Sequence, residues 1–312
     1  MSTEQSTNRS DPIRDVQSPQ EQRWGSGARV GIIGGMGEMG KLFAKFFRER
    51  HYSVEVADLG TARKNREVLQ AADIVVFSVP LHETVAIIDE LVPYVEPRHL
   101  LMDVSSLKVA PVHAMLRSPA AVVGLHPMFG GRIHSLSGQT LVACPVRIGA
   151  VEWQQIRETF LNAGMRVKEC SPEEHDRMMS IIQVLFHVTT MLMGRVLRDL
   201  EVDINETLEY TSPSYRLEMS LVGRMFAQSG VLYSAITEMN PNTGSILALL
   251  RQGLDCYEKW YRDGDFSSFV ADFQQSARHL GEFCTRGYQE SSAILDFVIQ
   301  LANQREKGTS DR

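Results

Sequence analysis

The spacing of apolar residues divides the chain into two parts with different patterns. Up to about residue 170, short runs rich in β-branched residues alternate with stretches of helical spacing. Buried strands are expected at residues 30–33, 53–57, 74–79, 100–104, 120–125 and 140–143, and helices at residues 39–48, 84–95 and 151–163. Strands that alternate with helices predict an α/β domain with a doubly wound parallel sheet over residues 28–170.

From about Ser171 this alternation gives way to long amphipathic stretches. They cover residues 172–200, 203–209, 213–228, 230–239, 243–262, 266–276 and 278–305. Because 312 residues exceed what a single core usually supports, we expect a second, all-α domain over residues 171–305. Its extensive apolar faces favour packing against a second subunit in a homodimer, and an ordinary helical core is the alternative.

The N-terminal segment and the overall composition narrow the function classes. Residues 1–27 contain few apolar residues and are predicted to be a disordered tail. The net charge of −6, without a basic stripe, argues against nucleic-acid binding. No apolar run reaches the roughly 18 residues of a membrane span, and the N-terminus lacks an apolar signal region. The cysteines lack CxxC spacing, which indicates reduced thiols in the cytoplasm and no metal site.

A glycine-rich turn follows the first expected strand and opens a helix. It reads Gly35-Met-Gly37-Glu-Met-Gly40, a GxGxxG pattern. Gly35 permits a tight turn, Gly37 lets backbone approach a pyrophosphate, and Gly40 allows close packing of helix and sheet. The helix N-terminus offers unpaired N–H groups to the phosphates. The pattern predicts a Rossmann-type dinucleotide site to which Met36 and Met39 also contribute, with a plain glycine turn as the alternative.

The ends of the next two strands supply further candidates for cofactor binding. Asp58 ends the second strand, where a carboxylate can accept hydrogen bonds from the ribose hydroxyls of NAD. It would repel a 2′-phosphate, which favours NAD over NADP, although Arg63 and Lys64 lie nearby. Ser78 and Pro80 end the third strand and are expected to face the cofactor.

Candidate catalytic residues follow two later strands. Ser106 and Lys108 come directly after the strand at residues 100–104, and Lys108 is a candidate cation for an anionic substrate. His126 follows an apolar run, and Pro127 is expected to end the sheet ladder there and hold His126 stiffly. A histidine at this edge can hydrogen-bond a substrate hydroxyl and take its proton as hydride leaves. A structural histidine is the alternative.

Several longer segments together carry a family resemblance. The chain contains, in one order, GIIGGMGEMG, FSVPLHET, DVSSLK, GLHPMFG, EEHDRMMSIIQVLFH and SPSYRLEMSLVGRMFAQ. Over about residues 28–300 these segments resemble the prephenate dehydrogenase family, especially its enterobacterial members. The resemblance implies an NAD-dependent oxidative decarboxylation. Hydride passes from ring carbon C4 of a cyclohexadiene to NAD+, and loss of the ring carboxylate gives an aromatic product.

The same resemblance assigns roles to individual residues. It implies that His126 binds the C4 substituent and that Ser106 helps to orient both His126 and the substrate. Arg224 matches the arginine that binds a substrate carboxylate, and His187 matches a second active-site histidine on a helix. His175, in contrast, is interpreted as a structural residue of a polar turn.

The chain also departs from the enterobacterial pattern. Those enzymes carry a chorismate mutase domain where this chain has a short polar tail, and an arginine where it has Phe186. The missing cation suits a substrate that carries an ammonium at C4. 4-Amino-4-deoxyprephenate, used in antibiotic biosynthesis, is therefore a candidate substrate together with prephenate. Arogenate is a third candidate. Imine and β-hydroxyacid dehydrogenases usually rely on a lysine in the helical half, where this chain has Lys259 and Lys307. An NAD-sensing regulator would need neither His126 nor Arg224.

Overall fold

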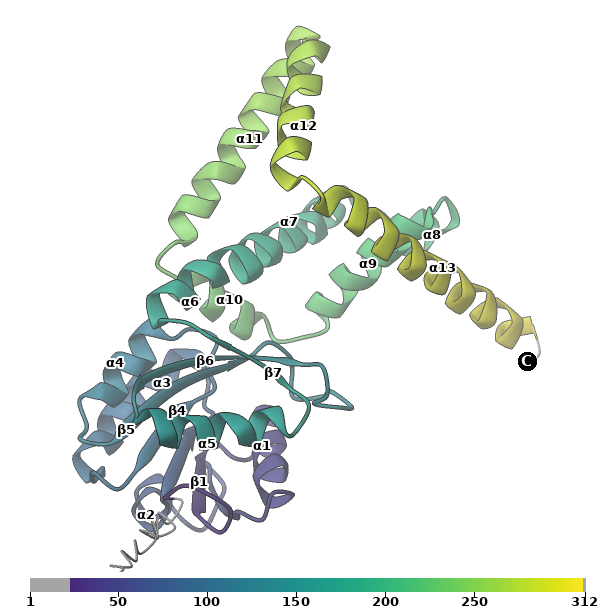
Figure 1. Ribbon diagram of the computed structural model, residues 1–312. Helices are drawn as coiled ribbons and strands as arrows, with labels where there is room; N and C mark the ends of the chain where they lie inside the picture. The colour runs from purple at the N-terminus through teal and green to yellow at the C-terminus, as the bar shows by residue number, and fades with distance from the viewer. Residues whose placement is uncertain (1–22, 311–312) are drawn as a thin grey trace, which may run out of the picture.

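A seven-stranded sheet forms the centre of the first half of the molecule (Figure 1). The computed structural model describes residues 23–310. The strand order across the sheet is β2-β1-β3-β4-β5-β6-β7. The strands are β1 (Arg29–Ile33), β2 (Ser53–Ala57), β3 (Ile74–Phe77), β4 (Leu100–Asp103), β5 (Ala121–Pro127), β6 (Thr140–Arg147) and β7 (Arg166–Glu169). The strands β1 to β5 run parallel, as the alternating pattern predicts.

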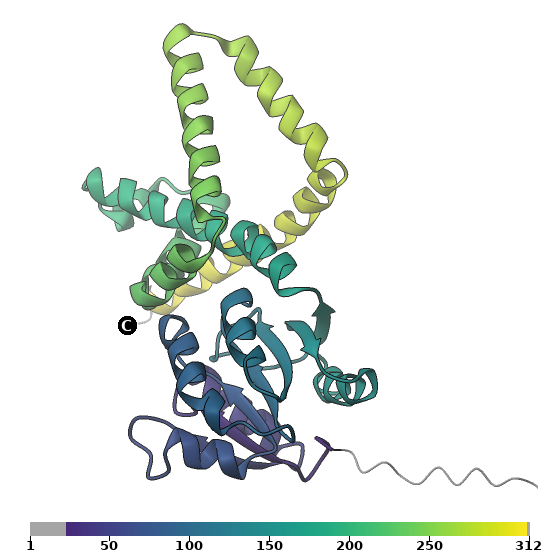
Figure 2. The same cartoon turned by 90° about the vertical axis from the view of Figure 1, so that its left-hand side faces the viewer.

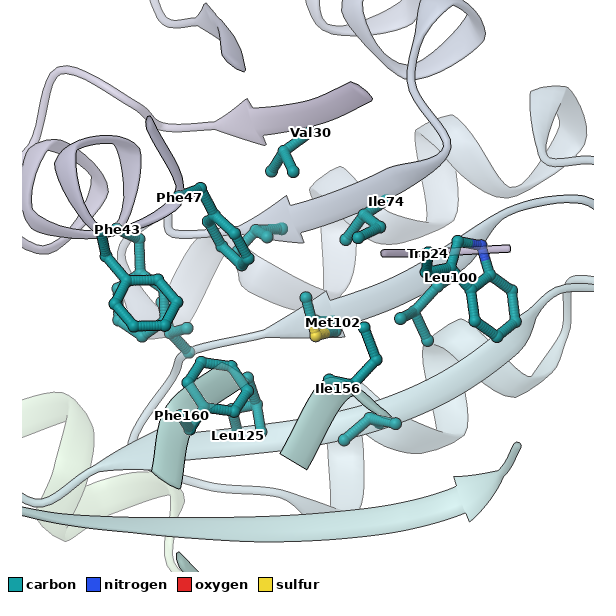
Figure 3. Close-up of a cluster of buried hydrophobic side chains, with 14 of the residues drawn as sticks. Trp24, Val30, Phe43, Phe47, Ile74, Leu100, Met102, Leu125, Ile156 and Phe160 are labelled. Carbon is teal, nitrogen blue, oxygen red and sulfur yellow. The ribbon is translucent and has the colours of Figure 1, made fainter. Parts of the chain in front are cut away.

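Helices cover both faces of the sheet, and each face has its own apolar cluster. On one face lie α1 (Glu38–Arg48) and α5 (Ala150–Leu161), which contribute Phe43, Phe47 and Phe160 to the cluster (Figure 3). Phe46 of α1 stacks on Phe160 of α5 with ring centroids 5.2 Å apart. The other cluster joins the sheet to α2 (Asn65–Ala71), α3 (Leu81–Leu91) and α4 (Val109–Leu116), with the single turn η1 (Val92–Tyr94) after α3. Every side chain of β3 and β4 is buried, which explains their continuous apolar runs.

The far edge of the sheet departs from the parallel pattern. β6 runs antiparallel to β5, and β7, which the apolar pattern did not indicate, runs parallel to β6. The pairing of β5 continues through His126 and Pro127, so the expectation that Pro127 ends the ladder is wrong. The N–H of Met128 donates to Thr140 at 2.9 Å, which places Pro127 at the alternate position where a ladder requires no N–H. His126 is therefore held inside a strand.

The predicted N-terminal tail is too long by several residues. Trp24 is only 3% exposed and packs in the cluster beneath α1 and α5 (Figure 3). Its indole N–H donates to the carbonyl of Arg98 at 3.3 Å, and its own carbonyl accepts from the Tyr52 hydroxyl at 3.2 Å. A single large aromatic residue thus anchors the segment before β1. Residues 1–22 of the predicted tail lie outside the described residues.

The second half of the molecule is helical, as predicted, but most of it projects away from the sheet (Figures 1 and 2). Its elements are α6 (Pro172–Met179), the π-helical segment η2 (Ser180–Leu185), α7 (Phe186–Asp199), α8 (Ile204–Glu209), α9 (Pro213–Phe226), α10 (Gly230–Met239), α11 (Thr243–Asp263), α12 (Phe266–Leu280) and α13 (Phe283–Ser310). Neither α11 nor α12, both within the described residues, contains a buried residue.

The elements α6, η2 and α7 form one continuous helical segment. By length and composition this segment, residues 172–199, is apolar enough to cross a membrane, although the sequence contains no unbroken apolar run of that length. In the most apolar stretch of 18 residues within this segment, 22% is buried inside the structure. The segment also carries His175 and Asp176, which are buried against the sheet domain. Its polar first turn therefore belongs to the contact between the two halves.

Candidate active site

The glycine turn between β1 and α1 is packed too tightly for larger residues at three of its positions. Gly34 has a φ of +81°, and a Cβ there would lie 2.4 Å from the carbonyl oxygen of Ser78. A Cβ on Gly35 would meet Val56 at 2.5 Å, and one on Gly40 would meet the Gly34 carbonyl at 2.4 Å. The left-handed turn therefore falls at Gly34, one residue earlier than predicted. Gly35 and Gly40 serve the close packing of turn, helix and sheet.

The middle of the turn, residues 36–38, is open toward solvent. Gly37 is exposed, and a Cβ there would meet nothing closer than 3.5 Å. Met36 is 51% exposed, whereas Met39 is partly buried against the core under α1. The helix α1 begins at Glu38 without a side-chain cap. The first N–H groups of α1 beside this exposed glycine fit a phosphate group.

Asp58 lies directly across from the glycine turn. Its Oδ2 accepts from the N–H of Met36 at 2.9 Å, and its Oδ1 accepts from the N–H of Leu59 at 2.8 Å. The nearby Arg63 is paired with Glu55, so its charge is directed away from Asp58. Asp58 remains half-buried. A carboxylate in this position fits the hydroxyls of a ribose, as the spacing predicts.

The end of β3 lies against the same turn. The N–H of Ser78 donates to the carbonyl of Ile33 at 2.8 Å. Pro80 is exposed and precedes the first residue of α3, where its carbonyl accepts from the Thr84 hydroxyl at 3.0 Å. Both residues thus lie at the carboxyl edge of the sheet, beside the glycines.

His126 lies at the same edge of the sheet and is almost completely buried. The pairing of β4 with β5 ends at Gly124, so His126 stands two residues beyond the end of β4. It is 4% exposed, and its Nδ1 lies 2.9 Å from Nε2 of His175. Burial lowers the pKa of His126 well below its usual range, and the neighbouring His175 and Lys108 lower it further. The ring is therefore neutral at pH 7 and can accept a proton.

His175 is not the isolated turn residue that its polar surroundings suggested. Its Nδ1 lies 2.7 Å from Oδ1 of Asp176, and its own pKa is lowered by burial. Ser171 begins α6, because its hydroxyl accepts from the N–H of Glu174 at 3.1 Å and Pro172 occupies the first turn. This capped start fixes His175 and Asp176 in the first two turns, facing β5.

Asp176 joins the two halves of the molecule. It accepts from the N–H groups of Lys108 at 2.8 Å and Val109 at 3.1 Å, which begin α4. Its own carbonyl accepts from the buried side-chain amide of Asn240 at 2.9 Å. The sequence signal for this role was an aspartate next to a histidine just after a Ser-Pro helix start.

Lys108 is buried beneath His126, which corrects the expectation that it binds substrate. Its side chain has no exposed surface; Nζ pairs with Asp103 and donates to the carbonyl of Leu125 at 2.7 Å. A Cβ on Gly124 would lie 2.8 Å from Cγ2 of Val112 and 3.0 Å from Cδ of Lys108, so a larger residue where the lysine crosses β5 would displace both side chains. The ammonium supports the strand that carries His126, and the ionised Asp103 compensates its buried charge.

Ser106 is not joined to His126 in this structure. Within residues 23–310 its side chain makes no hydrogen bond, whereas the neighbouring Ser105 hydroxyl bonds to Asp103 and to the carbonyl of Leu107. Ser106 is half-buried at the same edge of the sheet. The contact to the His126 ring that was expected from a serine is made by His175 instead.

His187 belongs to a second group of residues on the helical half. Its ring meets that of Tyr233 edge-on, with centroids 4.8 Å apart, and its buried Nδ1 has no partner within the described residues. Burial lowers the pKa of His187. Burial raises the pKa of Tyr233, and the positive charge of Arg224 opposes that shift. Arg224 itself is exposed in the last turn of α9.

The structure thus brings the predicted residues together in two groups. His126 and Lys108 belong to the first, and His187 and Arg224 to the second. His187 lies twelve positions after His175 on the segment 172–199, a rise of roughly 18 Å at about 1.5 Å per residue. Among residues 23–310, no hydrogen bond or ring contact joins the groups. The π-helical turn η2 lies between them, a feature often found beside functional sites.

A dinucleotide turn and a buried, neutral histidine at one sheet edge, followed by a helical half, define the class of NAD-type dehydrogenases. Family models of this class match the chain. The nucleotide-binding domain of prephenate dehydrogenase matches residues 48–169, and the dimerization domain of prephenate dehydrogenase matches residues 171–275.

Individual proteins agree with these models. The T-protein of Haemophilus influenzae is 32% identical over 282 residues, 90% of this chain and 73% of that protein. The 4-amino-4-deoxyprephenate dehydrogenase of Streptomyces pristinaespiralis is 27% identical over 274 residues, 81% of this chain and 92% of that protein. The crystal structure of Aquifex aeolicus prephenate dehydrogenase with hydroxyphenyl propionate and NAD+ superimposes with a TM-score of 0.63 at 18% identity, covering 82% of this chain and 99% of that one.

The chain belongs to the prephenate dehydrogenase family. The family resemblance, the Rossmann-type fold with a helical second half and the oxidoreductase class predicted from the sequence are confirmed. This membership replaces the imine or β-hydroxyacid dehydrogenase alternative. Lys259, the lysine considered for that alternative, lies exposed on α11.

Proposed function

We propose that this protein catalyses the NAD-dependent oxidative decarboxylation of a prephenate-type cyclohexadiene. The observation that carries the proposal is the position of His126, buried and neutral at the sheet edge that also bears the glycine turn. Prephenate itself would give 4-hydroxyphenylpyruvate. The cofactor is NAD, because Asp58 presents a carboxylate where a 2′-phosphate would have to lie.

In this reaction His126 acts on the C4 substituent of the ring. Its Nε2 accepts the hydrogen bond of the C4 hydroxyl and holds that proton while hydride leaves C4. Bound NAD+ supplies the hydride acceptor. The electron pair of the bond between C1 and its carboxylate then enters the ring, CO2 leaves, and the proton returns to the phenolic oxygen. No net proton is consumed, so the histidine is ready for the next turnover.

The helical half supplies the groups that hold the substrate. Prephenate is a dianion and the protein has a net charge of −6, so binding requires a fixed cation. Arg224 is exposed, its positive charge acts on Tyr233 of the half-buried pair His187 and Tyr233, and its planar guanidinium suits a carboxylate. We assign Arg224 to substrate binding and His187 to the same end of the site. Ser106 faces the reacting end near His126.

The proposed work is divided between two domains. Residues 28–170 bind NAD through Gly35, Gly37 and Gly40, their neighbouring methionines, Asp58, and the strand end at Ser78 and Pro80. Residues 171–305 bind substrate and join two copies into a homodimer. The free thiols of all the chain's cysteines support a reducing compartment, the cytoplasm.

Phe186 supports 4-amino-4-deoxyprephenate as a second candidate substrate. It is 47% exposed and its ring centroid lies 6.0 Å from that of His187. An aromatic ring here leaves one cation fewer near the substrate groups, which suits a ring that carries an ammonium at C4. The relative from Streptomyces pristinaespiralis acts on that compound, as its name states. The product would be 4-aminophenylpyruvate. Arogenate is a third candidate.

Turnover with purified substrates tests the proposal. NADH absorbance is followed after prephenate, arogenate or 4-amino-4-deoxyprephenate is added with NAD+, and kcat/KM is compared among the three. We expect a large preference for prephenate or its amino analogue. Absence of NADH with all three would overturn the proposal and favour an NAD-sensing regulator.

A further inference from the structure

A chain of buried hydrogen bonds runs from Asp176 through His175 to His126. The atoms are 2.7 Å apart at the first step and 2.9 Å apart at the second. His175 and Asp176 are 1% and 3% exposed. This chain crosses from the helical half to the sheet, and neither the resemblance nor the fold assigns it a task. We propose that His175 is a positioning residue that holds His126 in the tautomer whose Nε2 is free to accept the substrate's proton.

The direction of each hydrogen bond follows from counting hydrogens. The carboxylate of Asp176 already accepts one backbone N–H on each oxygen, from Lys108 and Val109. An ionised carboxylate accepts only, so Nδ1 of His175 carries the hydrogen that points to Asp176. A neutral imidazole carries one hydrogen, which leaves Nε2 of His175 as an acceptor. His126 must therefore donate from Nδ1, and its Nε2 keeps a lone pair.

The surroundings keep His175 neutral, on which this assignment depends. Burial lowers its pKa, and the positive charge of Lys108 adds to that effect against the opposing Asp176 and Asp103. These groups come from α6, β4 and the start of α4, the elements packed around the two rings. A protonated His175 would donate from both nitrogens and would force His126 to carry its hydrogen on Nε2. The substrate hydroxyl would then meet a donor where it needs an acceptor.

The backbone of His126 is fixed separately from its ring. The ammonium of Lys108 holds the carbonyl of Leu125, and β6 pairs with His126 itself. The position of the strand therefore does not depend on His175. Loss of His175 is expected to change the ring's tautomer and orientation while leaving the sheet intact.

Three substitutions of His175 separate the two hydrogen bonds. His175→Gln places an amide oxygen near the former Nε2, where it can accept from His126. His175→Asn keeps a donor to Asp176 but has no atom that reaches His126, and His175→Leu lacks both. We expect kcat to fall about 100-fold in the Asn and Leu variants, within the range for a general base, and less than about 10-fold in the Gln variant. KM and NAD affinity should stay unchanged.

A matched control and a second measurement complete the test. His113→Leu alters an exposed histidine of α4 and should leave kcat unchanged. In wild type, ¹⁵N NMR of the His126 ring should show hydrogen on Nδ1 and none on Nε2 at pH 7. Hydrogen on Nε2, or a Gln variant as slow as the Leu variant with intact folding, would overturn the inference.

The inference about kinetics rests on the proposed function, but the NMR measurement does not. If wild type turns over none of the three candidate substrates, the proposed function fails, and the tautomer of His126 still decides the role of His175. If wild type is active and the Asn and Leu variants are equally active, His175 has no positioning role and the proposed function stands.

Discussion

The two halves of this molecule bury their apolar residues in different ways. In the sheet domain, all residues of β3 and β4 are buried and both faces carry packed clusters. In the helical half, α11 and α12 have no buried residue within the described chain, and Tyr261, Phe266 and Phe273 are 91%, 77% and 67% exposed. Apolar surface of this extent on a monomer indicates an interface. The sheet domain completes its own core, whereas the helical half leaves apolar faces exposed, in agreement with the proposed homodimer.

This difference extends to the candidate site. The reacting group, His126, is held by its pairing with β6, by a buried lysine that binds the preceding carbonyl, and by His175. The substrate-binding candidate Arg224 lies exposed on α9, in the half whose packing is incomplete. We infer that the chemical step depends on the rigid half and substrate affinity on the helical half.

The largest effect should follow from removing the base. His126→Asn is expected to lower kcat by about 10²- to 10⁴-fold, because an amide cannot take the proton of the C4 substituent. NADH absorbance measures kcat, and nucleotide binding and thermal unfolding check the fold. His113→Asn serves as the control on an exposed position. Equal activity of His126→Asn and wild type would show that the base does not lie in the sheet domain.

Removal of the proposed substrate cation should act mainly on affinity. Arg224→Gln is expected to raise KM about 10- to 100-fold, since a hydrogen bond to a charged group contributes roughly 1.5–3 kcal/mol. The change in kcat should be much smaller. The control is Arg216→Gln on the same helix, because the Arg216 guanidinium contacts the carbonyl of Leu208 at 3.5 Å. A fall in kcat with unchanged KM would contradict the division between chemistry and binding.

The exposed apolar faces of the helical half predict that this protein forms a homodimer through them. Phe269→Asp combined with Phe273→Asp places two charges in the apolar face of α12 and should dissociate the proposed homodimer, halving the particle mass measured by light scattering. Leu59→Asp is a matched change at a fully exposed apolar residue of the sheet domain, 101% exposed, and should leave the mass unchanged. A dimer that survives the double change would place the interface elsewhere.

The smallest effect concerns pH. His126 must be neutral to accept a proton, and burial lowers its pKa well below the ordinary 6.5. Activity should therefore be nearly full at pH 6.5 and should fall only at lower pH, as His126 becomes protonated. The acidic limb of kcat/KM against pH measures this value. An acidic limb with its midpoint at or above pH 6.5 would mean that water reaches the His126 ring. The site in the sheet domain would then not be as dry as its burial indicates.

Much of the fold follows from local patterns. The alternation of apolar runs with helical spacing places β1 to β5 within a few residues of their observed bounds. β7 was missed because its sequence, RVKE, is short and mostly exposed, so it carries no apolar run. Trp24 was assigned to a tail because a single aromatic residue in a polar segment gives no periodic signal, although the core has room for it.

The candidate site, too, has features that the sequence predicts and features that only the structure shows. Local sequence patterns were enough to predict the two-part architecture, the dinucleotide turn and the presence of His126 at a sheet edge, because strand periodicity and glycine turns act over a few neighbouring residues. Only the tertiary structure decided that β6 runs antiparallel, that Lys108 is buried beneath β5, and that His175 reaches His126. That last contact joins residues 49 positions apart, and the contact of Asp176 with Lys108 joins residues 68 apart. Such partners depend on how finished elements pack, which no local window of the sequence contains.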